Sequence, residues 1–244
     1  GLVPLTPVQA WFFRHHEHGL HHFNQSILLK TDEPIDETGI RSVFEQLFHH
    51  HDMLRATFTK TPDGWAQEVG EHSEVCIEHI DLRETSEPAS ALESHAAGIQ
   101  GSFDLSEGPL AKAVIYRMPD GDRLFVVIHH LLVDGVSWRI LLEDLETGYG
   151  QYLRESEIEF AGRTDTFLAW SKSLRRFGES EEMKQEMRNW IEDDRTATTD
   201  IPLDFNPSGV NNLYRETETV GVSLSEEETK AFLSHPQRAY RADA

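Results

Sequence analysis

The sequence predicts an α/β protein, an α+β two-layer sandwich in which helices pack against neighbouring strands. Residues 110–117 and 123–129 are densely apolar, as expected of strands that are covered on both faces. Residues 138–153 carry apolar side chains at intervals of three and four, which is the spacing of a helix. The strand candidates mostly follow one another along the chain, and this order favours a mixed fold over strict alternation with helices.

The composition indicates which partners to exclude and in which cellular compartment the protein is expected. The 244 residues suffice for one large domain or two modest ones. The net charge of -21 would repel a polyanion, so we expect no nucleic-acid partner. Cys76 is the single cysteine, which excludes an internal disulfide and fits a reducing cytoplasm. We find no signal peptide and no apolar run of membrane-spanning length, and so expect a cytoplasmic protein without a membrane partner.

The first elements have recognisable start signals. Thr6 can cap a helix in which Pro7 occupies the first position and Gln9 closes a capping box. Residues 22–30 read as a strand. Asp36 is expected to open a second helix, which has a buried apolar stripe. The stripe consists of Ile40, Val43, Phe44, Leu47 and Phe48.

The remaining elements are predicted from apolar spacing and turn residues. The expected strands are 53–60, 65–69, 75–81, 110–117, 123–129 and 213–223. The expected helices are 89–100, 138–153, 167–177 and a last helix opened by a capping box at Ser225. Residues 178–200 are charged and read as a linker containing a polar helix, and 201–204 as an extended return.

Most of the chemistry lies in one short stretch. His129 and His130 end an apolar strand, Asp134 follows, and Gly135 leads into a helix. Such a turn can present an imidazole at the mouth of a cleft, and histidine titrates near neutrality, so His130 suits a general base. Gly135 would permit a backbone with φ > 0. For a lone histidine pair, the alternative is a satisfied core pair at a strand end.

Asp134 is expected to have a structural role, in which its carboxylate stabilises the conformation of this loop. It is surrounded in sequence by Leu132, Val133 and Val136, so its carboxylate is predicted to point inward. A buried carboxylate needs a cation or several donors, and Arg55 is a plausible partner. Replacing Asp134 by Ala should then cost roughly 3–5 kcal/mol.

These residues lie in motifs that resemble a known family. The span His129–Trp138 looks like the HHxxxDG signature of condensation and epimerization domains of nonribosomal peptide synthetases, which belong to the chloramphenicol-acetyltransferase-like superfamily. Pro7–Phe12 is similar to the first epimerization motif, PIQxWF, and His51–Phe58 to the second shared motif. The order Val-Ser-Trp-Arg from Val136 favours epimerization over condensation. Further matches are Thr164–Trp170, Asn189–Trp190 and Ile201–Asp204.

The resemblance implies an amino-acid epimerase, an isomerase that inverts the α-carbon of an aminoacyl or peptidyl thioester from L to D. It makes His130 one acid/base, supported by His129, Asp134, Gly135, Ser137, Trp138 and Arg55. No cofactor is expected to bind directly, because the substrate arrives on the phosphopantetheine arm of a peptidyl carrier domain. Adjacent synthetase domains are the other implied partners, in antibiotic or other secondary metabolism.

The family's second base is a glutamate in an EGHGRE motif, which this chain lacks. The resemblance therefore implies an N-terminal acetyltransferase-like lobe over residues 1–178 and, over 179–244, a linker with the beginning of a second lobe. Since the family's substrate tunnel lies between two lobes, the 244 residues alone are expected to be inactive. The segment with His22, Asn24 and Gln25 resembles one that faces the active-site region in epimerization domains, so these side chains are expected to line the channel.

Other readings stay open from the sequence. The first alternative is a condensation domain, in which His130 would support attack of an amine on a thioester. The second is an inactive fragment that only binds carrier protein. A metal site is not expected, because the histidines at 15–22 have no tetrahedral ligand spacing and those at 49–51 suit the end of a helix.

Overall fold

The structure is a computed structural model that describes the chain except for residues 17, 72–73, 163–164, 194–217 and 241–244. It divides into two compact units, Gly1–Asp193 and Asp194–Ala244. The first unit extends beyond residue 178, where the first lobe was expected to end. The division into family lobes stays a prediction.

The first unit contains all described strands and most described helices. Its helices are α1 (Pro7–His15), α2 (Glu37–His50), the 3₁₀ helix η1 (Asp52–Arg55), α3 (Pro88–Gln100), α4 (Gly135–Leu153), α5 (Phe167–Gly178) and α6 (Glu181–Asp193). Its strands are β1 (Leu2–Val3), β2 (Asn24–Thr31), β3 (Ala56–Thr61), β4 (Gly64–Val69), β5 (Cys76–Asp81), β6 (Ala111–Met118) and β7 (Gly121–His129). The mixture of helices and sheets confirms the predicted α/β class.

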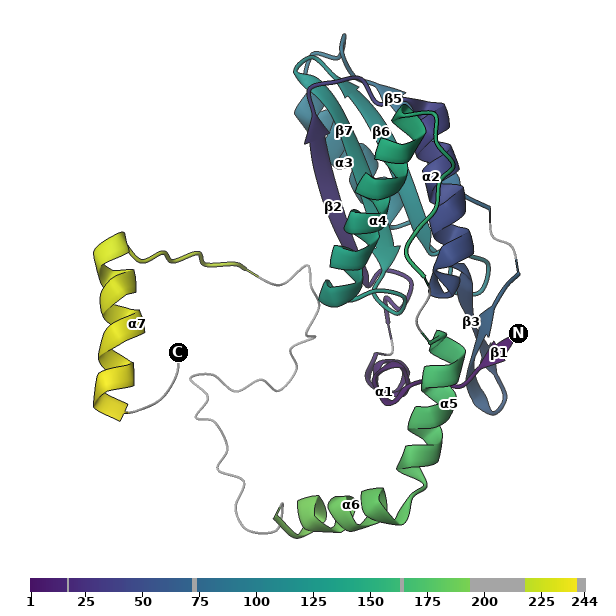
Figure 1. Cartoon of the computed structure of the whole chain (residues 1–244), viewed down its shortest axis with the longest axis vertical. Helices are drawn as coiled ribbons and strands as arrows, with labels where there is room; N and C mark the ends of the chain where they lie inside the picture. Colours follow the sequence, from purple (N-terminus) through teal and green to yellow (C-terminus); the bar gives the residue numbers. More distant parts are fainter. Residues whose placement is uncertain (17, 72–73, 163–164, 194–217, 241–244) are drawn as a thin grey trace. The chain divides into compact units, whose positions relative to one another are not determined.

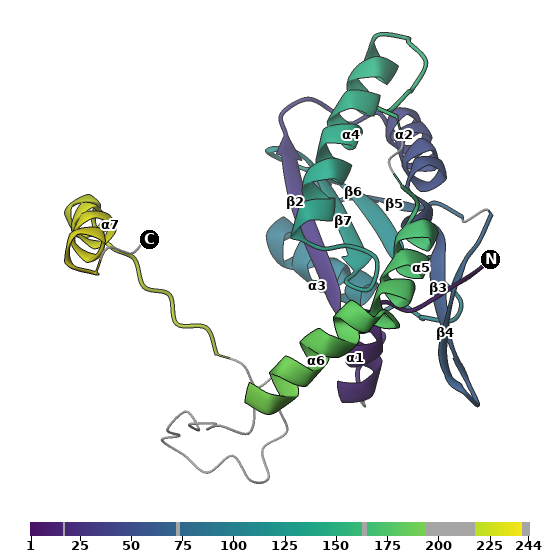
Figure 2. The ribbon, with the colours of Figure 1, turned by 60° about the horizontal axis from the view of Figure 1, so that its bottom comes forward.

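The larger sheet has four strands in the order β2-β7-β6-β5. Strands β2 and β6 both pair antiparallel with β7, whereas β5 pairs parallel with β6. Helices α2 and α4 lie on one face of this sheet and α3 on the other (Figures 1 and 2). The central strands β6 and β7 are almost entirely buried, which confirms that their dense apolar runs are covered on both faces.

A tight turn joins β6 to β7. Gly121 there has φ +103°, a conformation that L side chains rarely adopt. A Cβ at Gly121 would lie 2.4 Å from the carbonyl oxygen of Thr31, so only glycine fits both the backbone and the space. Both strands run farther into this turn than the sequence indicated, and Met118 pairs with Gly121.

A buried ion pair fixes the same end of the sheet. Asp122 is 6% exposed and accepts hydrogen bonds from Arg117 Nη1 and from the backbone N–H of Ile35 at 2.8 Å. Arg117 Nη2 donates to the carbonyl oxygen of Ile35 at 2.7 Å. The β6–β7 hairpin is thereby tied to the segment that leads into α2.

The smaller sheet, in the order β1-β4-β3, corrects one boundary. The predicted strand 53–60 begins only at Ala56, because residues 52–55 form η1. The physical reason is local: the N–H of Leu54 bonds back to the carbonyl of His51 at 3.1 Å, which closes a turn at the end of α2. The predicted hairpin between 53–60 and 65–69 is otherwise present.

Two helix starts follow their capping residues. In α1 the Gln9 Oε1 accepts a hydrogen bond from the N–H of Thr6 at 3.0 Å, as the predicted capping box requires, and a second one from the Thr6 hydroxyl at 3.2 Å. Helix α4 begins at Gly135, three residues before the predicted start at Trp138, because Asp134 caps it.

The second unit is described from residue 218. Helix α7 (Glu226–Tyr240) starts at the predicted capping box, in which Ser225 N–H donates to Glu228 Oε2 at 2.9 Å. The predicted strand 213–223 is wrong over 218–223, which is not in a strand, and its first residues lie outside the described part. The predicted extended segment 201–204 also lies outside it.

The structure bears on two features noted in the sequence, the lack of a membrane-spanning segment and the single cysteine. Among the described helices, none is both long and apolar enough to cross a membrane. Cys76 is a free, half-buried cysteine in β5. Burial raises the pKa of its thiol, so the protonated form is favoured and a nucleophilic role is not supported.

Candidate active site at the end of β7

The histidine motif forms a short loop between β7 and α4. The N–H of His130 donates to the carbonyl of Phe23 at 2.8 Å, which continues the pairing of β7 with the segment before β2. The chain then turns, and the Nδ1 of His130 lies 2.7 Å from the carbonyl oxygen of Val133. A carbonyl oxygen can only accept, so Nδ1 carries the proton in this contact.

His129 is fully buried and both of its ring nitrogens are occupied. Its Nε2 lies 2.8 Å from the carbonyl oxygen of Leu20, and its Nδ1 accepts from the N–H of Leu131 at 3.2 Å. Burial lowers the pKa of His129 to about 4. The ring is therefore neutral near pH 7 and holds the loop together, whereas its neighbour faces the opposite side of the strand.

His130 is partly exposed and its ring is held in a defined orientation. It stacks on Phe23, with ring centroids 5.2 Å apart and an interplanar angle of 15°. Its Nε2 lies 3.2 Å from the side-chain amide nitrogen of Gln25, whose Oε1 accepts from the indole N–H of Trp138 at 2.9 Å. Gln25 comes from β2 and Trp138 from the first turn of α4.

The predicted burial of Asp134 is wrong. The residue is exposed, and its carboxylate caps α4 by accepting from the N–H groups of Val136 at 3.1 Å and Ser137 at 2.8 Å. The hydroxyl of Ser137 donates to the same oxygen at 2.8 Å. Hydrogen bonds from Ser137 hold the pKa of the carboxyl below its ordinary value. The apolar neighbours were a poor guide, because Leu132 and Val133 are buried whereas Val136 is exposed, like Asp134.

Arg55 and Gly135 also have roles that differ from those expected. Arg55 in η1 donates to the carbonyl oxygens of Phe48, His49 and Gly70, so it fastens the end of α2 to β4. Since Asp134 is exposed and caps α4, the buried pair predicted between it and Arg55 is wrong. Gly135 is the first residue of α4 and is not among the described glycines with positive φ, so the backbone freedom predicted for it is not used.

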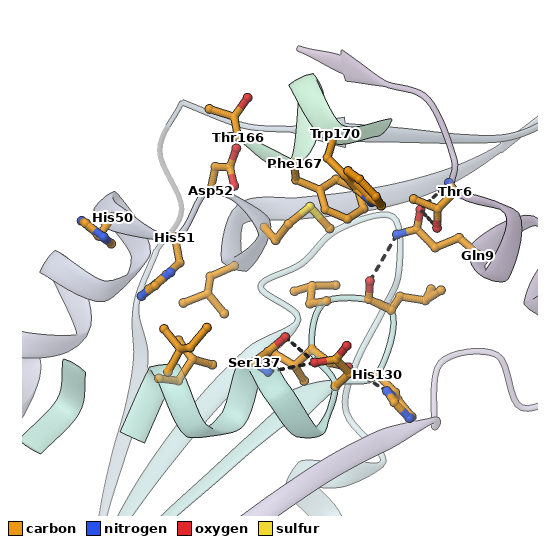
Figure 3. Close-up of a pocket in the computed structure, with 18 of the residues that line it drawn as sticks. Thr6, Gln9, His50, His51, Asp52, His130, Ser137, Thr166, Phe167 and Trp170 are labelled. Atoms are coloured by element: carbon orange, nitrogen blue, oxygen red, sulfur yellow. Dashed lines mark hydrogen bonds between the residues drawn. The ribbon is translucent and has the colours of Figure 1, made fainter. Parts of the chain in front are cut away.

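A cavity of about 920 Å³ opens beside the loop. Figure 3 shows His130 and Ser137 on one side of it and Phe167 and Trp170 of α5 on the other. Most of its other lining comes from α1, η1, the motif loop and the first turns of α4. These residues include Trp11, Met53, Leu132, Val133, Ile140 and Leu141. An apolar chamber with an imidazole at its wall can receive a flexible acyl group and exchange a proton with it.

The three residues predicted to line a channel take separate positions, and none of them lines this cavity. His22 is exposed. The amide of Asn24 donates to the carbonyl of Gln100 at 2.8 Å, on the side of the sheet where α3 lies. Gln25 points the other way and contacts His130, because side chains alternate along a strand.

Gln9 has a role in the site that sequence reasoning missed. It is 4% exposed, and its Nε2 donates to the carbonyl oxygen of Leu131 at 3.2 Å, which is drawn as a dashed line in Figure 3. The same side chain closes the capping box of α1, so one amide joins α1 to the histidine loop. The glutamine in the first motif was the available signal, but only its local capping role could be derived.

A possible metal-binding group lies at the far wall of the cavity. His50, His51 and Asp144 offer one ligand atom each, within 4.8 Å of one another. His51 Nε2 already lies 2.7 Å from Asp144 Oδ2, a contact that joins the end of α2 to α4. Three donors with an existing mutual hydrogen bond fit a structural contact, and a fourth protein ligand would be needed for a closed zinc site.

Sequence comparison finds that the chain is similar to parts of much longer synthases. A family model described as the condensation domain matches residues 1–243. A linear gramicidin synthase protein of Brevibacillus parabrevis is 39% identical over 249 residues, covering 99% of this chain and 3% of that protein. Tyrocidine synthase 2 of the same organism is 34% identical over 247 residues, covering 100% of this chain and 7% of that protein. The chain thus spans a small part of these relatives.

Solved structures give the same fold. The epimerization domain from the third module of tyrocidine synthetase B superposes with a TM-score of 0.90 at 34% identity, over 100% of this chain and 56% of that one. The starter condensation domain of rhizomide synthetase gives a TM-score of 0.70 at 16% identity, over 79% of this chain and 48% of that one, which is evidence of fold alone. Since the family model spans residues 1–243, the chain belongs to the condensation-domain family and has the acetyltransferase-like fold that its sequence predicted.

Proposed function

We propose that the chain supplies the His130 side of an epimerization site, which inverts the α-carbon of an aminoacyl or peptidyl thioester. The substrate would be carried on the phosphopantetheine arm of a peptidyl carrier domain within a nonribosomal peptide synthetase. One observation carries this proposal: His130 lies at the cavity wall with Nδ1 bonded to the Val133 carbonyl, so that Nε2 is the nitrogen with a lone pair. In this structure that lone pair accepts a hydrogen bond from the Gln25 amide at 3.2 Å, so Nε2 can take a proton from carbon only after this contact opens.

The proposed reaction is a balanced transfer of one proton. The bond between the α-carbon and its hydrogen breaks, the proton moves to His130 Nε2, and the electron pair is delocalised onto the thioester oxygen as an enolate. A second acid then protonates the α-carbon from the opposite face, and His130 returns its proton to that acid through solvent. The resemblance assigns the second group to a glutamate outside this chain, so a complete site needs residues beyond these 244.

Epimerization is favoured over condensation by two observations. The motif residues Val136–Arg139 and Pro7–Phe12 resemble epimerization motifs. The epimerization domain of tyrocidine synthetase B shares 34% identity with the whole chain, whereas the starter condensation domain shares 16% with part of it. In a condensation site, His130 would instead assist attack of an amine on the thioester.

Solvent exchange distinguishes the two reactions. The synthetase module that carries this chain is loaded with an L-aminoacyl thioester on its carrier domain and incubated in deuterated water. We expect deuterium at the α-carbon and formation of the D-isomer without a new amide. Formation of an amide without exchange would identify a condensation site.

A variant series assigns the base. His130→Ala in the same module is expected to lower exchange by roughly 10²- to 10⁴-fold, the range for loss of an acid/base group. His95→Ala is the matched control, because His95 bonds Tyr116 away from the cavity. Normal exchange in His130→Ala would refute the assignment. Absence of both exchange and amide formation in the unmodified module would favour the remaining alternative, a segment that only binds carrier protein.

A further inference from the structure

A chain of three hydrogen bonds runs from Trp138 through Gln25 to His130 and Val133. The indole N–H of Trp138 lies 2.9 Å from Gln25 Oε1, and Gln25 Nε2 lies 3.2 Å from His130 Nε2. His130 Nδ1 lies 2.7 Å from the carbonyl oxygen of Val133. The residues come from β2, the histidine loop and α4, so three separate segments meet at one imidazole.

The direction of each hydrogen bond follows from its two ends. An indole nitrogen can only donate, so the atom of Gln25 that faces it is the oxygen. The amide NH₂ of Gln25 then faces His130, and because NH₂ can only donate, His130 Nε2 must accept. At the other end a carbonyl can only accept, so His130 Nδ1 must carry the proton. Both ends select the same neutral tautomer.

We propose that Trp138 and Gln25 are a positioning pair that selects Nε2 of His130 as the basic nitrogen. Trp138 fixes which way the Gln25 amide faces, and Gln25 in turn fixes the proton-free nitrogen of His130. Phe23 stacks on the imidazole and limits its tilt. None of these residues needs to touch the reacting atoms.

The positioning pair also links proton uptake by His130 Nε2 to the loss of its hydrogen bond with Gln25. His130 Nε2 has one lone pair, which accepts from Gln25, so the Gln25–His130 hydrogen bond must open before Nε2 takes up the α-proton. Trp138 opposes rotation of the amide, because rotation would turn an NH₂ group toward the indole N–H. The original contact is regained only when the proton leaves. The kinetic consequence rests on the proposed function, whereas the tautomer follows from the contacts alone.

The tautomer is measured by ¹⁵N NMR of the chain labelled at histidine, at a pH where imidazoles are neutral. The His130 signals are identified by their loss in His130→Gln, and we expect a protonated Nδ1 and an unprotonated Nε2. Gln25→Glu puts an acceptor in front of Nε2 and should place a proton there. Trp138→Phe keeps the ring but frees the amide, and should give a mixture of tautomers. Trp65→Phe is the matched control, since Trp65 stacks on Phe13 in another part of the unit.

An unchanged His130 signal in both folded variants, or a protonated Nε2 in the original chain, would overturn the positioning pair. Should Trp138→Phe fail to fold, Gln25→Glu alone decides. In the synthetase module, Trp138→Phe is expected to lower kcat for α-proton exchange roughly 10- to 100-fold with little change in KM. If the tautomer responds as expected in the chain but the complete synthetase module shows no exchange, the proposed function fails and the positioning pair stands.

Discussion

The Asp134 carboxylate and Ser137 form a closed cap at the start of α4. One carboxylate oxygen accepts both the backbone N–H and the hydroxyl of Ser137, each at 2.8 Å. The cap makes α4 start directly after the histidine loop. It thereby fixes the position of Trp138 in the first turn of the helix. The aspartate of the motif thus acts on the backbone, and its exposure rules out the buried ion pair that its sequence context suggested.

Asp134→Ala is expected to lower the free energy of unfolding by about 1 kcal/mol, the usual cost of losing a helix cap. This is well below the 3–5 kcal/mol expected of a broken buried pair. Asp134→Asn retains a capping oxygen and should cost less. Urea unfolding of the three proteins measures the difference. Because hydrogen bonds from Ser137 lower the pKa of the carboxyl, the cap's contribution should persist above pH 3.8 and fade below it. A loss above 3 kcal/mol would contradict the capping role.

A buried ion pair lies at the other end of the sheet, between Arg117 and Asp122. Their side chains are 17% and 8% exposed. Asp122→Asn removes the buried carboxylate and leaves Arg117 with the more exposed Glu37 at 3.7 Å, so we expect a loss of roughly 2–3 kcal/mol in unfolding free energy. The control is Asp120→Asn. Asp120 pairs with Lys30 and Arg123 at the exposed turn, so this variant should lose less than about 1 kcal/mol of unfolding free energy. Equal losses in the two variants would refute the distinction.

The sequence predicted well those helices and strands whose signals, apolar periodicity and capping residues, lie within the element itself. The apolar runs of β6 and β7 and the capping boxes at Thr6 and Ser225 needed no tertiary information. It failed at residues 53–55, because the 3₁₀ turn there is closed by the bond from the Leu54 N–H to the His51 carbonyl, which apolar spacing does not reveal. It also failed over 218–223, since alternation of side chains does not supply a pairing partner for a strand.

For the site, the sequence singled out His130, and the geometry around it could not be derived from the same information. Gln25 belonged to the predicted channel and Trp138 to the supporting motif, yet their contact joins positions 113 residues apart. The Gln9–Leu131 bond spans 122 residues in the same way. Such contacts depend on which strand faces pair and where helices start, which local patterns leave undetermined.

His129 should make the fold sensitive to acid. Its pKa is lowered from 6.5 to about 4 by burial, so between these values the unfolded chain binds more protons than the folded one. This contribution to stability is complete above pH 6.5, falls as the pH drops, and amounts to a loss of roughly 3 kcal/mol by pH 4. His129→Gln lacks the titrating group, so its deficit relative to the original protein should shrink over this interval in urea unfolding. A constant deficit from pH 7 to pH 4 would show that His129 titrates normally in the fold.

The contact between His51 and Asp144 is expected to be independent of metal. Asp144→Asn weakens a 2.7 Å hydrogen bond to a charged group and should lower the free energy of unfolding by roughly 1.5–3 kcal/mol. That loss should be the same with excess zinc and with a chelator, because His51 and Asp144 already satisfy each other. The control is Glu143→Gln, the adjacent acid on α4, whose side chain is 70% exposed and should matter little. If zinc stabilises the original protein but not Asp144→Asn, the three-residue group holds a metal ion and the prediction fails.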